Sequence, residues 1–441
     1  MRFPSVRQIR RPVYVFSEDG KQTHVDKFRG ILKHSPLKPA KTPDPHYLFI
    51  FCQDDRDYAN SLYTALRSGM ASFPGSHQFV GLSISKDQLE PCRLPTTCFQ
   101  PGNEKQLYSS VYAHLEKSQK KADFAYIIGS SNWKYHRPSP YGAIKAALLQ
   151  HGVPSQMVTR QLLQAGSQFR FAIPNIALSA LAKLGGVPWL IQRSTEPPAL
   201  VIGIGTTTVR NPTGQTKERY LGYAICMLSN GLFLDLSFFG ASTSHNEFLP
   251  KLTEGLGSTL DRLEKAQSKV SRISLHVSQF ERYDTISAIA NLLGKRKQAQ
   301  PSPVPFELLR LSHDSSFTVM DFDDPGFVAE EGSVVDLAPR HSLVVMEGRQ
   351  EKAAWRGRKP VTLEVHREYV SNPSLSFPDS LRDVFHLGFV NWRGFGTKTK
   401  PATLAYAKLL SERVADMAAV VPSIIDSIET NVSFGSSLWF L

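Results

Sequence analysis

Apolar runs and helix-spaced segments alternate along the chain from about residue 45 to residue 190. The runs Tyr47–Cys52, Phe79–Ile84 and Phe124–Gly129 have the length and the mainly apolar character of buried strands. Strands and helices that alternate in this way predict a doubly wound, Rossmann-like α/β domain, which binds ligands beyond the carboxyl ends of its strands. Helices are expected at Ala59–Met70, at Leu107–Glu116, and from residues 141 and 175 onward.

A second pattern begins after the polar, proline-containing segment Arg193–Pro198. The apolar run Ala199–Gly205 predicts a buried strand, and Asn230-Gly231 predicts a tight turn between two further strands. Three early antiparallel strands, a long charged helix and another strand form the order of a ribonuclease H-like domain. The later elements are expected as strands at Tyr220–Ser229, Leu232–Phe239, Arg272–Val277, Phe306–Ser312, Phe317–Asp321, Leu343–Glu347 and Val361–Val365, and helices at Leu252–Lys269, Thr285–Leu293 and Pro401–Met417.

These patterns divide the chain into three parts. Residues 1–45 are polar and contain several prolines, which predicts an extended arm or a lead-in strand docked on another surface. Residues 46–196 form the Rossmann-like domain, and residues 197–441 form the ribonuclease H-like domain. The strand at Val361 is expected to pair with the strand at Leu343.

The charge of the chain points to a polyanionic partner. The 441 residues have a formal net charge of +12, and basic proteins of this kind are most simply explained by nucleic-acid binding. The four cysteines lack the spacing of a zinc site, which suits a reducing cytosol. The basic N-terminus has no following apolar region, and no apolar run reaches 18 residues. We therefore expect a cytoplasmic protein without a membrane partner.

Four polar side chains stand out in the apolar stretch from Ser139 to Leu190. Tyr141 and Lys145 are four residues apart, so on a helix they share one face. Lys183 lies in the last turn of the next expected helix, and Gln156 lies between the two helices. A phenol, two ammonium groups and an amide form a suitable cradle for a terminal phosphate, which binds most strongly to charged donors. The alternative is that both lysines are ordinary solvated side chains.

These residues resemble a known family. The order Tyr141-x3-Lys145, Gln156, Asn175 and then KLGGVPW at residues 183–189 resembles the MID domain of Argonaute proteins. The runs VIGIG at 201–205, FLDLSFFG at 233–240 and AYAKLLSERV at 405–414 resemble the PIWI domain that follows it. The resemblance covers residues from about 45 to 441 and includes no PAZ domain, so the chain is similar to a short prokaryotic Argonaute.

The resemblance implies a site for the 5′ end of a guide strand. Tyr141, Lys145, Gln156 and Lys183 match the residues that hold the guide's 5′-phosphate, and the tyrosine also stacks on the first base. Arg413 matches a guide-phosphate arginine, although an arginine on a helix surface is the alternative. The carboxylate of Leu441 matches a ligand of Mg²⁺ that bridges the first and third guide phosphates. Residues 438–441 could instead be an apolar tail packed for stability.

The resemblance also implies that the PIWI domain does not cut. Active PIWI domains cleave with clustered carboxylates and two metal ions. Gly205 stands where the first carboxylate is expected, the segment Ile273–Ser278 contains no aspartate, and Lys408 replaces the last ligand. We therefore expect no enzymatic activity from this chain.

Other interpretations remain open. A guided nuclease could use other carboxylates, such as those of Asp314, Asp321, Asp323 and Asp324, although DFDDPG is more simply a turn. The run VIGIGTTTV also resembles a phosphate loop of actin-like kinases, which would make the chain a phosphotransferase. Gly205 and the lack of a second phosphate loop count against the kinase.

The resemblance implies a sensor with a separate output. The guide is a short 5′-phosphorylated strand, expected to be RNA rather than DNA, and the target is complementary single-stranded DNA. Short Argonautes act with a partner that contains an APAZ domain and an effector, which is a TIR or sirtuin-like NADase or a nuclease. Binding of the target switches the effector on, in defence against plasmids or phage.

Overall fold

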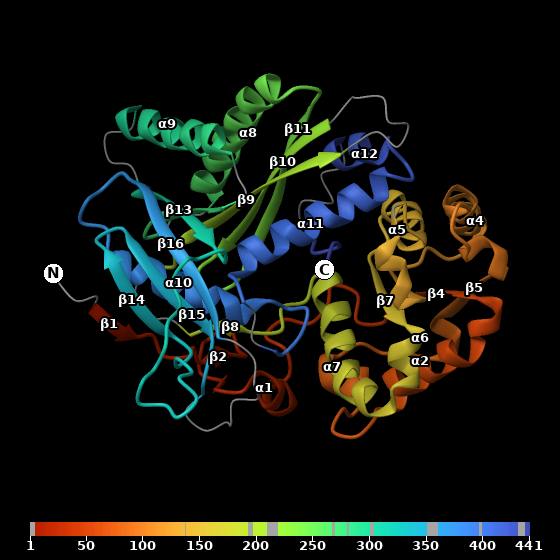
Figure 1. Cartoon of the computed structure of the whole chain (residues 1–441). Helices are drawn as coiled ribbons and strands as arrows, with labels where there is room; N and C mark the ends of the chain where they lie inside the picture. Colours follow the sequence, from red (N-terminus) through yellow and green to blue (C-terminus); the bar gives the residue numbers. More distant parts are fainter. Residues whose placement is uncertain are drawn as a thin grey trace.

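A computed structural model describes residues 5–136, 138–192, 197–209, 219–266, 270–279, 282–299, 304–350, 360–396, 399–430 and 437–441. It confirms the mixed α/β class (Figure 1). A small sheet with helices on its faces and a larger sheet lie on opposite sides of helix α11 (Ala402–Ala418). Most of the expected linker at Arg193–Pro198, from 193 to 196, lies outside the described residues.

The small sheet has four parallel strands in the order β5-β4-β6-β7. Two expected strands are confirmed as β4 (Tyr47–Cys52) and β6 (Phe124–Gly129), and every residue of both is buried. The other two strands are β5 (Leu89–Leu94) and β7 (Ser155–Thr159). Its helices are α2 (Arg56–Ser68), α3 (Ser76–Val80), α4 (Glu104–Lys117), α5 (Pro140–Gln150), α6 (Arg160–Gln164) and α7 (Gly166–Lys183).

The strand expected at Phe79–Ile84 is wrong. Residues Ser76–Val80 form the short helix α3, which ends at Gly81 in the left-handed conformation with φ of +73°. The second strand in sequence is Leu89–Leu94 instead. That strand lies at the edge of the sheet and contains Glu90, Pro91 and Arg93, so the apolar pattern did not reveal it.

The large sheet has nine strands in the order β1-β14-β15-β16-β13-β12-β9-β10-β11. Strands β9, β10 and β11 are antiparallel, and β12 runs parallel to both β9 and β13, as the expected ribonuclease H-like order requires. The bounds are β9 (Leu200–Val209), β10 (Arg219–Leu228), β11 (Phe233–Ser242), β12 (Ile273–Ser278), β13 (Phe306–Ser312), β14 (Ser333–Ala338), β15 (His341–Glu347) and β16 (Val361–Val370).

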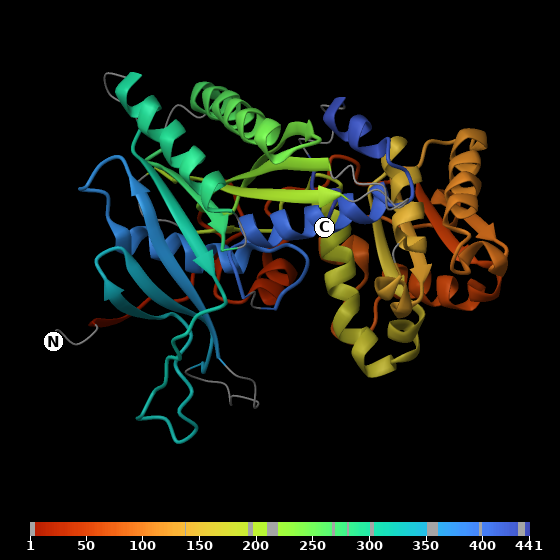
Figure 2. The same cartoon turned by 45° about the horizontal axis from the view of Figure 1, so that its top comes forward.

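Some of the predicted strand pairings of the large sheet are confirmed, and one predicted strand is wrong. The hairpin at Asn230-Gly231 is confirmed, and β16 pairs with β15 as expected. The strand expected at Phe317–Asp321 is wrong, because this segment makes only an isolated bridge between Met320 and Val328. It belongs to a loop that projects from the body between β13 and β14 (Figure 2), so no neighbouring strand pairs with it over any length.

The first described residues dock on the edge of the large sheet. Strand β1 (Ser5–Gln8) pairs antiparallel with β14 at the sheet edge, and Arg7 forms an ion pair with Asp336. Strands β2 (Tyr14–Val15) and β3 (Thr23–His24) form a separate three-stranded sheet with β8 (Leu190–Ile191). Helix α1 (Lys27–His34) follows β3 in the chain.

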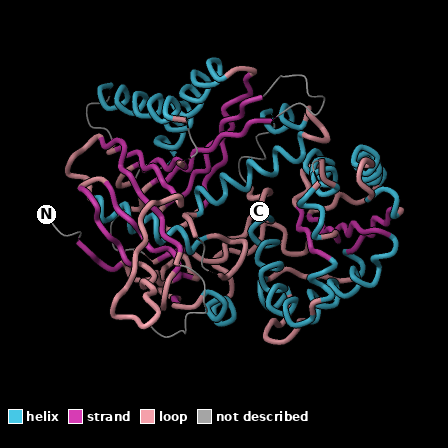
Figure 3. Tube along the Cα trace, viewed as in Figure 1, coloured by secondary structure: helices cyan, strands magenta, loops and turns pink. Residues whose placement is uncertain are grey.

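Helices cover both faces of the large sheet (Figure 3). On β9, Leu200, Ile202 and Ile204 pack in one core with α8 (His245–Ala266) and α9 (Tyr283–Ala299). The opposite face meets α11, together with α10 (Phe377–Leu387) and α12 (Ile424–Thr430). A Cβ atom at Gly203 would lie 2.6 Å from the Thr403 carbonyl oxygen, so this glycine allows α11 to lie directly on the sheet. Of the described helices, none combines the length and apolar composition that crossing a membrane requires.

Candidate functional site

The structure brings the four polar side chains of the predicted cradle together. Tyr141 and Lys145 lie on α5, Gln156 lies on the edge strand β7, and Lys183 is the last residue of α7. The Nζ atom of Lys183 donates hydrogen bonds to the Gln156 Oε1 atom at 2.8 Å and to the Ser155 carbonyl oxygen at 2.7 Å. The Ser179 hydroxyl also donates to Gln156 Oε1, at 2.9 Å, and holds the amide in place.

Both lysines are buried, so the alternative of ordinary solvated lysines is wrong. Lys145 and Lys183 are each only 2% exposed. Lys145 donates to the Trp439 carbonyl oxygen at 2.7 Å and makes longer contacts to Ser155. Among the described residues, neither ammonium group pairs with a carboxylate. Two buried positive charges held only by neutral oxygen atoms form an unbalanced site, because a buried charge without a counter-ion is costly.

The pKa values show the strength of this positive field. Burial lowers the pKa of Lys183 well below its ordinary value, and the nearby charge of Lys145 lowers it further. Burial alone would raise the pKa of Tyr141, but the charges of Lys145 and Arg413 outweigh it and lower that pKa. Tyr126, which is equally buried but has no such neighbours, has a raised pKa. An anion in the cradle would relieve these interactions.

Arg413 extends the cradle from the second half of the chain. Its guanidinium carbon lies 4.7 Å from the centre of the Tyr141 ring, and its buried Nε atom has no hydrogen-bond partner. Arg413 is therefore not a solvated arginine on a helix surface. The sequence did not single out Arg393, an exposed side chain whose charge also lowers the pKa values of Tyr141 and Lys183. No spacing signal links Arg393 to the cradle, because it follows a short 3₁₀ turn, Gly388–Val390.

The C-terminal segment lies beside the cradle. The side chains of Leu438, Trp439, Phe440 and Leu441 are all buried, and the Phe440 ring packs 5.8 Å from that of Tyr406 on α11. Burial of the tail fits both the terminal metal ligand and the apolar tail packed for stability. Its carbonyl contact to Lys145 had no sequence signal because it uses a backbone atom.

The oxygen atoms at the cradle suit Mg²⁺ only in part. The Gln156 amide oxygen, the backbone carbonyls and a carboxylate on Leu441 belong to the hard oxygen class that Mg²⁺ prefers. Two ammonium groups lie among them, so a cation fits there only together with anionic phosphates. Under that condition the Leu441 carboxylate would hold the ion, and Lys145 and Lys183 would face the phosphate.

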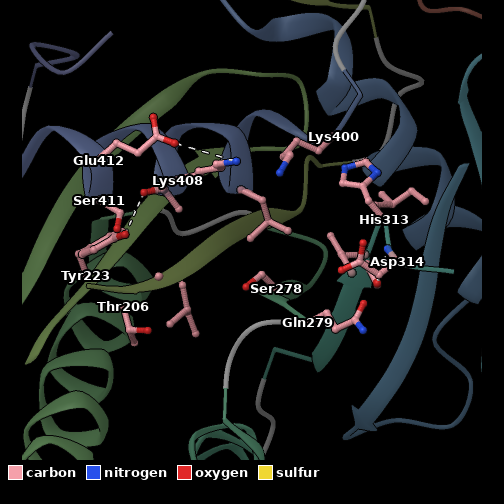
Figure 4. Close-up of a pocket in the computed structure, with 17 residues that line it drawn as sticks. Thr206, Tyr223, Ser278, Gln279, His313, Asp314, Lys400, Lys408, Ser411 and Glu412 are labelled. Atoms are coloured by element: carbon pink, nitrogen blue, oxygen red, sulfur yellow. Dashed lines mark hydrogen bonds and ion pairs between the residues drawn. The ribbon is translucent and has the colours of Figure 1, made fainter. Parts of the chain in front are cut away.

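A second cavity, of about 380 Å³, lies between α11 and the strands β9, β12 and β13 (Figure 4). The three positions at which the sequence lacks metal ligands meet there. Gly205 lies on β9, Ser278 at the end of β12, and Lys408 on α11.

The room for a carboxylate at position 205 is already filled. A Cβ atom there would lie 2.5 Å from the Tyr223 ring. Tyr223 is buried, and its hydroxyl donates to the Ala407 carbonyl oxygen at 2.9 Å, so the ring is fixed between β10 and α11.

The cavity is positively charged on its α11 side. Lys400 and Lys408 approach one another there (Figure 4), and burial together with the charge of Lys408 lowers the pKa of Lys400. Burial and the charge of Lys400 also lower the pKa of His313. Asp314 and Glu412 line the same cavity, and the Glu412 carboxylate lies 4.0 Å from the Lys408 ammonium. In the described ranges, neither carboxylate belongs to a group of three metal-ligating side chains.

Two sequence alternatives lose support. Thr206, Thr207 and Thr208 belong to β9 and pair with β10, so the VIGIGTTTV run is ladder backbone and not a phosphate loop. Asp321, Asp323 and Asp324 lie in a turn, in which Asp321 and Asp324 pair with Arg349 and accept backbone N–H bonds, whereas Asp314 lines the cavity.

Comparisons with known proteins agree with the fold. Residues 133–280 match the Piwi domain model. A Piwi protein of Archaeoglobus fulgidus is 24% identical over 326 residues, which cover 70% of this chain and 73% of that protein. The fold is similar to that of Clostridium butyricum Argonaute bound to a guide DNA and a target DNA, with a TM-score of 0.69, 15% identity and 94% of this chain covered. It is also similar to Drosophila Piwi, with a TM-score of 0.68, 16% identity and 99% coverage. The chain spans 53% and 56% of the length of those two chains.

Proposed function

We propose that this chain, in which residues 133–280 match the Piwi domain model and whose fold is similar to that of Argonaute and Piwi proteins, is a guide-binding sensor that recognises its target without cutting it. The observation that supports guide binding most strongly is the pair of buried lysines, Lys145 and Lys183, which have no carboxylate partner among the described residues. A terminal phosphate carries the charge and the acceptor oxygens that this site lacks.

The guide would enter with its 5′-phosphate on Lys145, Lys183 and Gln156. Arg413 and Arg393 would add positive charge, and the Tyr141 ring would stack against the first base. Mg²⁺ would neutralise the phosphates near the Leu441 carboxylate. The guide is RNA or DNA, with RNA favoured by the resemblance to short prokaryotic Argonautes.

The target would be complementary single-stranded DNA. Base pairing to the guide would provide sequence specificity, while the basic surface of a chain with net charge +12 would provide affinity that falls with salt. The second cavity supports binding without cleavage, because Gly205, Ser278 and Lys408 offer no carboxylate. Lys400 and Lys408 would instead contact the target backbone there.

A sensor that does not cut requires an output. We propose that an effector protein with an APAZ domain supplies it, by NAD consumption or by nuclease action, in defence against plasmids or phage. The support for this step is the resemblance to short prokaryotic Argonautes.

The test compares a 5′-phosphorylated guide with the same guide carrying a 5′-hydroxyl group, each as RNA and as DNA. The affinity of the purified chain for each is measured, and the loaded complex then receives complementary DNA with Mg²⁺ or Mn²⁺. We expect a preference for the phosphorylated guide and an intact, bound target. Equal affinities would contradict the phosphate site, and cutting at a fixed position would support the alternative of an active guided nuclease.

A further inference from the structure

A cluster of two histidines and one glutamate lies in the large sheet, on the side of α11 away from α5 and α7 (Figure 1). His341 begins β15 and stands opposite His366 of β16 in the strand register. Glu364 is two residues before His366 on the same strand, so its side chain projects from the same face. The pairing of β15 with β16 in the large sheet therefore places all three side chains together.

The three side chains direct their ligand atoms to one point. The Nε2 atom of His341 lies 2.7 Å from Glu364 Oε1, and the Nε2 atom of His366 lies 2.8 Å from the same oxygen. The imidazole rings are stacked, with centroids 3.8 Å apart and planes inclined by 21°. All three ligand atoms lie within 4.8 Å of one another. In the described part of the chain, this is the one group of three such residues that meets this condition.

The surroundings restrict the cluster without closing it. The side chains of His341, Glu364 and His366 are 20%, 13% and 27% exposed, so water and ions reach them while the strands fix their positions. The Phe317 ring stands edge-on 6.2 Å from the His341 ring and borders one side.

A hydrogen-bonded trio without a metal is the simpler interpretation, in which one oxygen of Glu364 accepts an N–H bond from each imidazole. A divalent ion between the three ligand atoms would serve both nitrogens and the oxygen at once.

We propose that His341, Glu364 and His366 bind one divalent transition-metal ion, with Zn²⁺ as the best-fitting member of the class. Two imidazole nitrogens and one carboxylate oxygen form a donor set that Zn²⁺ uses, with water in the fourth position. Zinc–ligand distances of about 2.0–2.2 Å place tetrahedral ligand atoms roughly 3.3 Å apart. The present separations of 2.7 and 2.8 Å would therefore open by about half an ångström, within reach of side-chain rotation.

The bound ion would connect β15 to β16 beside the loop that joins β13 to β14. Because the ion binds only the folded arrangement, it would raise the midpoint of thermal unfolding as its concentration rises. Mg²⁺ would not replace it, since Mg²⁺ prefers oxygen ligands in octahedral geometry. This site is distinct from the proposed guide site and does not depend on it.

The experiment uses the full chain after treatment with a chelator. Zn²⁺ is titrated against a competing indicator dye, and Co²⁺ is added separately to record the visible absorption of a four-coordinate site. We expect one Zn²⁺ per chain, a four-coordinate Co²⁺ spectrum and no displacement by excess Mg²⁺. His341→Ala and His366→Ala should each weaken Zn²⁺ binding by at least about tenfold.

Two further variants make the result decisive. Glu364→Gln keeps the size of the side chain and should also weaken binding, with an unchanged circular dichroism spectrum as the measure of folding. His77→Ala removes an exposed histidine of α3 and should bind Zn²⁺ like the unmodified chain. Zn²⁺ affinity that is unchanged in His341→Ala and Glu364→Gln, or equally reduced in His77→Ala, would overturn the proposal.

Discussion

Lys145 donates a 2.7 Å hydrogen bond from its Nζ atom to the carbonyl oxygen of Trp439, 294 residues later in the chain. This bond joins a helix of the small sheet's layer to the C-terminal segment that packs beside α11. The ammonium group is thereby oriented by a neutral backbone atom, and its charge remains available to a ligand. The cradle is built by both halves of the chain, and its chemistry leads to the first three predictions.

Lys145→Ala and Lys183→Ala should reduce the affinity for 5′-phosphorylated guides by about 10–100-fold, because each removes a charge-assisted hydrogen bond of roughly 1.5–3 kcal/mol. Guides with a 5′-hydroxyl group should lose far less. Fluorescence anisotropy with both guides measures the difference. Lys117→Ala, at an exposed position of α4, serves as the control. Similar losses for both guides would refute the assignment of the cradle.

Binding of a phosphorylated guide should take up protons at pH values between the lowered pKa of Lys183 and its ordinary pKa. Burial lowers the pKa of Lys183 and so favours its neutral form, whereas a bound phosphate favours the charged form. Between the lowered pKa of Lys183 in the folded chain and its ordinary pKa in the unfolded chain, the unfolded chain binds more protons. The free energy of unfolding of the unliganded protein should therefore rise with pH in that window. Calorimetry in buffers of different ionisation enthalpy measures the uptake. Lys183→Met should abolish it, and uptake that persists in this variant would assign it elsewhere.

Additional residues after Leu441 should weaken guide binding, because they would displace the carboxylate from a site bordered by buried side chains. Removal of Mg²⁺ should weaken the same interaction. Guide affinity with and without Mg²⁺ is compared for the chain and for a variant extended by a short Gly-Ser tail. If the extended variant keeps both its affinity and its Mg²⁺ response, the carboxylate is not a ligand.

Gly205→Asp should not create a nuclease. The new side chain would meet the Tyr223 ring at 2.5 Å, and overpacking of this kind costs about 1–3 kcal/mol. Ser278 and Lys408 would still provide no carboxylate beside it. Target DNA should therefore stay intact in a cleavage assay with Mn²⁺, while the midpoint of urea unfolding falls. Guide-directed cutting by this single variant would show that the cavity retains a working site.

Glu307→Ala should destabilise the chain by about 3–5 kcal/mol without changing guide affinity, since removal of one partner leaves buried charges unpaired. Glu307 is fully buried and bridges Arg272 and Arg367, while Arg272 also contacts Asp383. Urea denaturation measures the stability, and Glu368→Ala, at an exposed position of β16, is the matched control. Equal losses in both variants would show that the buried network has no special role.

Strands with a continuous apolar sequence were predicted correctly, whereas strands whose formation depends on tertiary contacts were missed. Strands β4 and β6 and residues 200–205 of β9 are buried on both faces and were evident from their residues alone. The edge strands β5 and β7 contain polar residues, and Phe79–Ile84 was apolar because it packs as a helix and loop in the core.

In the candidate phosphate site too, only the groups with a signal in the sequence were predicted. Tyr141, Lys145, Gln156 and Lys183 were named from their order, and the structure places them together. Arg393 and the Trp439 carbonyl depend on loop and backbone positions, which have no periodic signal. The filling of position 205 by Tyr223 also required the register between β9 and β10.

The pairing of β1 with β14 has a consequence for biosynthesis. Gln8 and Ser333, which face each other across this edge, are separated by 325 residues. A ribosome needs on the order of tens of seconds to make that length of chain. During this time β1 has no partner strand, and its backbone N–H and C=O groups are open to other extended chains. The small sheet can assemble meanwhile, but the large one is completed only after its last strands emerge, so a chaperone that shields the early segment would raise the yield of folded protein.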